Sequence, residues 1–244
     1  MFINQRPNWN KIVHIGLNKC SQGNVYHKLN LNKIGLDISY FNRLRLSYNN
    51  LPIDKDYPIK QMVPTRFRRY VNFDVDVRNK DLFRFNKKSN DSFHQDVDDF
   101  RKTPRLFSPM ENEVIDPYFY HLMTQIVGLT LHSNPNILKV NVSIHQVRLL
   151  SYPNLESDNA PEGIHRDGAD YIVSALIMNK YNIKEGVSSI YDPNKKFMYS
   201  TNLEEGEFIF QEDRHLWHDI TPIKANNNYI GYRDILGFDL KIKK

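Results

Sequence analysis

The strongest constraint on the fold is a series of short β-prone segments that fills the second half of the chain. The pattern predicts strands around 140–149, 170–178, 187–191, 197–200, 207–211, 216–220 and 229–241. Turn-forming residues separate several of these segments: Asp192–Lys195, Glu204–Gly206 and Ala225–Asn228. Many short strands in sequence predict an antiparallel barrel or a double-sheet jelly roll, whose mouth can hold a metal and a small ligand.

The first half of the chain contains one clear helix signal and one strand signal. Asp116 provides an N-cap, Pro117 fits the first helical position, and apolar residues recur at 119, 122, 123, 126 and 127. Thr65–Val77 ends in the alternation typical of a half-buried strand. We therefore expect a mainly β fold with helices flanking the barrel.

Composition limits the compartment and the kinds of site. The single cysteine, Cys20, excludes an intramolecular disulfide framework and a cysteine-rich zinc site. The first residues lack the apolar segment of a secretory signal. The longest strongly apolar run, Tyr171–Met178, is too short to cross a bilayer. We expect a soluble cytoplasmic protein without a membrane partner.

The charge balance is a modest basic bias. The chain has 33 basic and 28 acidic residues, a net charge of +5, and a sequence pI near 9.1. Such a surface suits anionic small substrates or nucleic acid, but the bias is small for a chain of this length. The richest basic cluster, Arg66–Tyr70, fits a solvated strand edge with ion pairs, a substrate-carboxylate site or a polyanion patch.

A histidine and an acid two residues apart, His165 and Asp167, are the first candidate metal ligands. On an extended strand, residues i and i+2 point to the same face, so these two side chains would project together. They would supply two thirds of a 2-His-1-carboxylate iron site. A second His-x-Asp, His94–Asp96, lies in a polar segment with no apolar strand after it, whereas Tyr171–Met178 follows His165 closely.

The third ligand is expected in the segment that holds His215 and His218. Pro222 and the β-prone residues around it argue against a helix here. On a strand, His215 and His218 face opposite sides, so only one of them can share a site with His165. Arg233 shares a face with Ile235 and Gly237; its guanidinium either points into the barrel or pairs with Asp219 or Asp234.

Three segments of the second half match a known family in order and spacing. They are Pro161–Gly168, Asp213–Ile223 with the pattern Asp-Arg-x3-His-x2-Thr-Pro-Ile, and Gly231–Leu236. Further blocks of similarity are Arg66–Tyr70, Gln95 followed by Arg105-x-Phe107-x-Pro109, and His145-Gln146-x-Arg148. In this combination the chain, from about residue 40 onward, resembles the Fe(II)/2-oxoglutarate dioxygenases of the bacterial L-isoleucine 4-hydroxylase type.

The resemblance implies a distorted double-stranded β-helix, a jelly-roll relative with a cupin-like core. It implies one dioxygenase domain over 1–244, with the core at about 140–242 and a helical and strand-containing part at about 1–139. His165, Asp167 and His218 would bind Fe(II), and Arg233 would hold the distal carboxylate of 2-oxoglutarate, the co-substrate used with O2. This chain departs from the family at Glu185–Gly186, where two glycines are expected, and at Asp219, where a small residue is expected.

The resemblance leads us to expect hydroxylation of a free L-amino acid, with an aliphatic side chain favoured and succinate and CO2 as co-products. The candidates for binding the substrate carboxylate are the arginines of the matching blocks: Arg66, Arg69, Arg105 and Arg148. The alternatives are the same chemistry on a nucleic acid or peptide, with nucleic acid the less favoured partner, and a non-catalytic β-barrel binding module. A zinc hydrolase would use the same ligand types, but no general base stands out for it.

Overall fold

A computed structural model of the protein describes residues 2–16, 18–19, 23, 25–57, 63–89 and 105–243. Its main feature is a nine-stranded sheet in which neighbouring strands pair antiparallel. The strands lie in the order β1 (Phe2–Gln5), β5 (Phe83–Lys87), β4 (Arg66–Asp76), β6 (Lys139–Ser151), β14 (Gly231–Lys243), β7 (Tyr171–Tyr181), β11 (Glu207–Gln211), β3 (Val25–Asn30) and β2 (Asn18–Lys19). The sheet thus takes strands from both halves of the chain.

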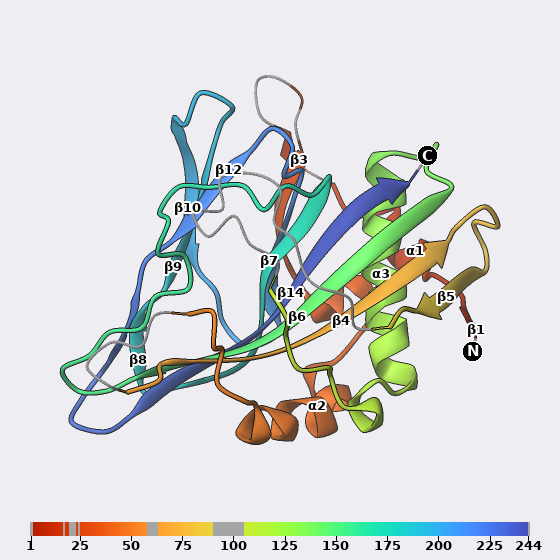
Figure 1. The fold of residues 1–244 in the computed structure, drawn as a ribbon. Helices are drawn as coiled ribbons and strands as arrows, with labels where there is room; N and C mark the ends of the chain where they lie inside the picture. Colours follow the sequence, from red (N-terminus) through yellow and green to blue (C-terminus); the bar gives the residue numbers. More distant parts are fainter. Residues whose placement is uncertain are drawn as a thin grey trace.

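Two smaller sheets and several helices complete the described part of the fold. One small sheet has the order β10 (Phe197–Asn202), β9 (Val187–Tyr191) and β12 (Trp217–Ile220), and the other pairs β13 (Ile223–Ala225) with β8 (Ile183–Glu185). The α-helices are α1 (Trp9–Ile12), α2 (Asn42–Ser47) and α3 (Pro117–Ser133). Four 3₁₀ helices are η1 (Leu31–Ile34), η2 (Ile38–Phe41), η3 (Tyr48–Asn50) and η4 (Asn112–Val114). Figure 1 shows α3 behind β14, β6 and β4, with the sheet β10-β9-β12 on the left.

The long helix α3 begins where its capping residues predict. The Asp116 side chain accepts a hydrogen bond from the Phe119 backbone N–H at 3.0 Å, and Pro117 occupies the first turn. Its apolar residues, such as Leu122 and Ile126, are fully buried against the main sheet. No helix in the described ranges combines the length and apolarity needed to cross a membrane.

Alternation along the strands gives the two faces of the main sheet different roles. On β6, Val142 and Ile144 belong to the large core that includes α3, whereas Val147 and Leu149 belong to a second core on the other face. That second core also contains Ile190 of β9, so it lies between the main and the smaller sheets. The side chains on the helix-covered face are apolar, whereas the opposite face can also carry polar side chains.

The expected fold class, mainly β with a jelly-roll core, is confirmed. The predicted helix and the strands from residue 65 onward occur at nearly the expected positions. By contrast, β1 and β3 are not predicted, although β3 pairs with β11 from Tyr26, opposite Gln211, to Asn30, opposite Glu207. The rival pair His94–Asp96 lies outside the described residues.

Candidate functional site

Three side chains from two distant parts of the chain face one another. His165 and Asp167 lie in the loop before β7, and His218 lies on β12. His165 and His218 exchange two backbone hydrogen bonds of 2.9 Å. The Asp167 carboxylate lies 3.6 Å from His165 Nε2 and 3.5 Å from His218 Nε2. The expected strand at 165–167 is therefore reduced to one bridging residue, but the expected partners do meet.

Both histidines direct Nε2 toward the carboxylate. The Nδ1–H of His165 donates to the Gly163 carbonyl at 2.7 Å, which leaves the Nε2 lone pair free. Burial works to lower the pKa of His165, but the charges of Asp167 and Glu162 raise it above its ordinary value. Burial and the neighbouring His165 lower the pKa of His218 to about 3, so His218 is a neutral imidazole.

Asp213 holds the loop that carries Asp167. Its buried carboxylate accepts backbone N–H groups of Asp167 at 3.2 Å, Gly168 at 2.8 Å and Ala169 at 3.0 Å. Burial and the nearby Asp167 charge raise the pKa of Asp213 to about 7. Asp213 begins the motif Asp213–Ile223, but the sequence does not reveal the hydrogen bonds through which it holds the loop of Asp167.

The donor atoms of the three side chains fit a metal of the kind expected. Ligand atoms of His165, Asp167 and His218 all lie within 4.8 Å of one another. Two imidazole nitrogens and one carboxylate oxygen suit Fe(II) and leave coordination positions open for other ligands. Within the described ranges, no second group of histidine, cysteine and acidic side chains has this arrangement.

The three side chains border a pocket formed by the polar face of the main sheet. The pocket encloses about 860 Å³, including its open mouth. Its sheet-derived lining includes Arg68, His145, Ser174, Gln211, Gly237 and Asp239.

Two of the four arginines expected for the substrate, Arg66 and Arg105, line this pocket. Arg66 is buried, with Nε 3.1 Å from Asp54, and its Nη1 donates to the Asn159 carbonyl at 3.2 Å. Arg68, which was not among the four, joins them, and its guanidinium lies 4.2 Å from the centre of the Phe107 ring. Burial and the neighbouring Arg66 lower the pKa of Arg68 to about 9, which still leaves it charged at neutral pH.

Three ionisable side chains form a hydrogen-bonded chain on the pocket face. Arg68 Nη2 lies 2.5 Å from His145 Nδ1, and His145 Nε2 lies 3.0 Å from Asp239 Oδ2. Arginine only donates, so Nδ1 of His145 accepts and Nε2 carries the proton that Asp239 accepts. Burial and the neighbouring arginines lower the pKa of His145 well below its ordinary value, consistent with a neutral ring.

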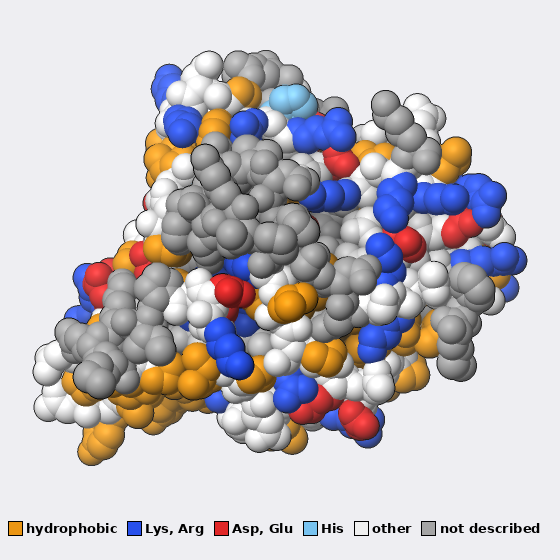
Figure 2. All heavy atoms as spheres, viewed as in Figure 1, with side chains coloured by type: hydrophobic (Ala, Val, Ile, Leu, Met, Phe, Trp, Pro, Cys, Tyr) orange, Lys and Arg blue, Asp and Glu red, His pale blue; other side chains and the backbone are white. Residues whose placement is uncertain are grey.

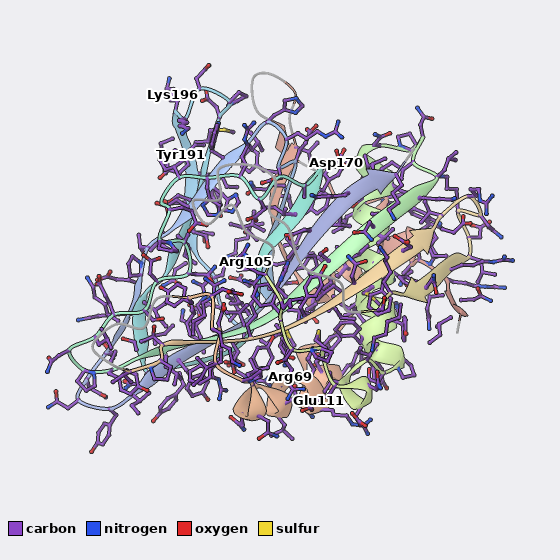
Figure 3. All side chains as sticks on the ribbon, viewed as in Figure 1. Arg69, Arg105, Glu111, Asp170, Tyr191 and Lys196 are labelled. Carbon is purple, nitrogen blue, oxygen red and sulfur yellow. The ribbon has the colours of Figure 1, made fainter. Side chains whose placement is uncertain are left out.

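The other two expected arginines, Arg69 and Arg148, have partners outside the pocket lining. Arg69 pairs with Glu111 at 2.9 Å, and Figure 3 shows both near the foot of the molecule, with Arg105 above them between the sheets. Arg148 forms a two-bond pair with the buried Asp234 at 2.6 and 2.7 Å. Arg148 and Arg69 therefore lie apart from the pocket lining to which Arg66 and Arg105 belong.

Arg233 projects from β14 on the face that carries Ile235 and Gly237, as its spacing predicts. It is 2% exposed, and its Nη1 donates to the Gly186 carbonyl at 2.9 Å. Its Nε and Nη2 have no hydrogen-bond partner among the described residues. Burial lowers the pKa of Arg233 to about 10, so the group is a buried cation suited to a carboxylate ligand.

The two departures from the expected family pattern have distinct surroundings. Glu185 and Gly186 both adopt positive φ, 64° and 72°, so the turn keeps a backbone that favours glycine although Glu185 is not one. Asp219 lines the pocket, and its Oδ1 accepts the Ile220 N–H at 2.7 Å.

His215 lies in the turn before β12 and is about half exposed, so of His215 and His218 only His218 joins the site.

The face of the molecule in Figure 2 bears on the alternative of a polyanion-binding groove. On the face in Figure 2, basic side chains are interspersed with acidic ones. Several surface lysines and arginines also pair with acids, as Lys28 does with Glu207 at 2.7 Å. Binding to single-stranded nucleic acid requires a continuous basic groove with aromatic platforms. The described atoms in this view form no such stripe.

Comparisons with known proteins agree with this geometry. The family model for 2OG-Fe dioxygenases matches residues 45–239. A bsmA homologue from Methylobium petroleophilum PM1 superposes with a TM-score of 0.78 at 17% identity, over 89% of this chain and 88% of that one. IDO from Bacillus thuringiensis superposes with a TM-score of 0.72 at 17% identity, over 90% and 94%. The Fe(II)/α-ketoglutarate-dependent dioxygenase TqaL gives 0.61 at 16% identity, over 90% and 84%. No curated protein matches the sequence.

Proposed function

The chain belongs to the 2OG-Fe dioxygenase family, and from this premise we propose that it hydroxylates a free aliphatic L-amino acid. Members of this family use Fe(II), 2-oxoglutarate and O2. When bound, these supply the oxidation in which one oxygen atom enters a C–H bond of the substrate and the other enters succinate, with release of CO2. The chain itself supplies ligands, a charged pocket and control of orientation.

His165, Asp167 and His218 are the proposed iron ligands, and Arg233 is the proposed partner of the distal carboxylate of 2-oxoglutarate. Two imidazole nitrogens and a carboxylate match the preference of Fe(II) for mixed nitrogen and oxygen donors. The unpaired Nε and Nη2 of Arg233 support its assignment, because a planar guanidinium binds a carboxylate through two parallel hydrogen bonds.

The observation that carries the substrate proposal is the set of buried arginines in the same pocket as the three proposed ligands. Arg66 and Arg105 are the proposed partners of the substrate carboxylate, and Arg68 adds a third positive charge beside them. Asp54 lies beside two of these charges, with Oδ2 3.1 Å from Arg66 Nε and 4.0 Å from Arg68 Nη1. A guanidinium group binds a carboxylate through charge-assisted hydrogen bonds, so a pocket lined by these arginines suits a small substrate with its own carboxylate.

A mass-spectrometric screen tests the proposal. The protein is incubated aerobically with Fe(II), 2-oxoglutarate and a panel of aliphatic L-amino acids, and both succinate and product are measured. We expect amino-acid-dependent succinate and a product heavier by one oxygen atom. The variant His218→Ala should abolish both, whereas His215→Ala, altered at a half-exposed histidine of the same segment, should retain both. Absence of any product across the panel would contradict the free amino acid as substrate.

A further inference from the structure

A free amino acid brings two charges into the pocket, and the proposed function so far accounts for one of them. Its ammonium group would be buried, and a buried cation without a partner is strongly unfavourable. Besides Asp167, three acidic side chains line the described part of the pocket: Glu162, Asp219 and Asp239. Their surroundings differ enough to decide between them.

Asp239 has one oxygen fixed by the protein and one available. Its Oδ2 accepts the proton on Nε2 of His145 at 3.0 Å, and His145 is in turn held by Arg68. Its Oδ1 makes no hydrogen bond to any residue in the described part of the chain, although the residue is 9% exposed. Burial and the nearby charges of Asp167 and Asp213 raise the pKa of Asp239. A cationic ligand beside this pocket-lining carboxylate would oppose that effect and stabilise its charged form.

The other two acids are less suited to an ammonium group. Glu162 Oε1 lies 3.6 Å from Nε2 of His165, the nitrogen proposed to bind iron. An ammonium placed there would lie against the metal cation and be repelled by it. Asp219 already accepts a hydrogen bond from the Ile220 N–H, and it follows the proposed ligand His218 directly in the sequence.

The position of Asp239 along β14 also fits. Asp239 and Arg233 lie on the same face of the strand, six residues apart, which corresponds to roughly 20 Å at about 3.3 Å per residue. Arg233 is proposed to hold the far end of 2-oxoglutarate, so Asp239 lies well away from that carboxylate along the strand. The ammonium of an amino acid oxidised on its side chain must likewise lie several bonds away from the oxidised carbon.

We propose that Asp239 binds the substrate's α-ammonium group and that Arg68 and His145 hold Asp239 in position for this contact. The inference depends on the proposed function, because it assigns a partner to the second charge of a free amino acid. It makes the recognition specific for a zwitterion: arginines bind the carboxylate, and Asp239 binds the ammonium. A molecule with the same carbon skeleton but no ammonium should be bound much more weakly.

Binding measurements without turnover test this assignment. The protein is loaded with Mn(II) and 2-oxoglutarate under anaerobic conditions, and the amino acid that the screen identifies is titrated by calorimetry. The matching 2-hydroxy acid, in which hydroxyl replaces ammonium, is titrated in parallel. We expect the unmodified protein to prefer the amino acid by at least tenfold. Asp239→Asn should lose most of this preference, chiefly by binding the amino acid at least tenfold more weakly.

Controls separate a binding role from a structural one. Retained affinity for 2-oxoglutarate shows that Asp239→Asn is folded. If Asp239→Asn does not fold, Asp239→Ser, which leaves room for a water molecule, is measured in its place. Equal affinity of the unmodified protein for both ligands would overturn the assignment, as would an unchanged preference in the variant. Loss of the preference in Glu162→Gln but not in Asp239→Asn would move the ammonium to Glu162 and also overturn it. Failure of the unmodified protein to bind any amino acid would overturn the proposed function itself.

Discussion

Arg233 is buried and Arg148 is partly buried, and their guanidinium groups have different partners. Arg148 is fully engaged, with two hydrogen bonds to Asp234 and one to Asn49 at 2.8 Å. Arg233 has one protein partner, the Gly186 carbonyl, and two nitrogens without one among the described residues. Because an unsatisfied buried cation is costly, the first arrangement stabilises a fold and the second is suited to an anionic ligand.

Arg233→Lys is expected to weaken 2-oxoglutarate binding. Lysine keeps the positive charge but loses the two parallel hydrogen bonds, each worth about 1.5–3 kcal/mol when charged. One such bond corresponds to a rise in the KM for 2-oxoglutarate of roughly 10- to 100-fold. The dependence of succinate formation on 2-oxoglutarate measures the effect. Arg69→Lys, at an arginine outside the pocket lining, is the matched control; equal KM values for both variants would contradict the role of Arg233.

Arg148→Met is expected to destabilise the fold without changing amino-acid recognition. The substitution leaves the carboxylate of Asp234 buried, with the Asn179 amide at 2.7 Å as its remaining side-chain partner. Removal of one partner of a buried ion pair costs about 3–5 kcal/mol. Chemical denaturation measures the loss of unfolding free energy, and kinetics measure the KM for the amino acid. A raised KM with unchanged stability would return Arg148 to the substrate site.

The helices and strands of this fold can largely be predicted from local sequence, whereas the pairing between strands cannot. The Asp116–Pro117 cap predicts α3, and the alternation of β6 and β14 predicts both strands. The strand β3 escapes prediction because it has only two buried residues, Val25 and Leu29, and depends on pairing with β11. The sequence of 165–167 suggests a strand, but its one ladder contact with the described residues is the bridge from His165 to His218.

The turn between β8 and β9 is expected to determine how well Arg233 is placed. Gly186 has a φ of 72°, and a Cβ there would lie 2.9 Å from Arg233 Nη1 and 2.9 Å from Ile223 Cγ2. Gly186→Ala should therefore displace the guanidinium and raise the KM for 2-oxoglutarate, with a loss of about 1–3 kcal/mol in stability. Gly16→Ala, where a Cβ meets nothing within 4 Å, is the control. An unchanged KM in Gly186→Ala would show that the turn does not position Arg233.

The candidate site is a product of register across the main sheet. Pairing across β4, β6 and β14 places His145 opposite Tyr70 on one side and opposite Gly237 on the other. Arg68 lies two residues from Tyr70 and Asp239 lies two residues from Gly237, each on the same face of its strand. A motif search can identify His165, Asp167, His218 and Arg233, because they lie in three short segments of fixed order and spacing. It does not identify the chain from Arg68 to Asp239, because those residues come from three strands whose alignment is fixed only by the assembled sheet.

A metal at the proposed site would join the main sheet to the smaller one, because Asp167 lies in the loop before β7 and His218 lies on β12. A ligand that binds only the folded state stabilises it by about 2.7 kcal/mol at one hundred times its Kd. For a chain of 244 residues, this corresponds to a rise in Tm of roughly 5–10 °C. Thermal unfolding with Mn(II) should show this rise in the unmodified protein and in His215→Ala, and lose it in His218→Ala and Asp167→Ala. An equal rise in all four proteins would place the metal elsewhere.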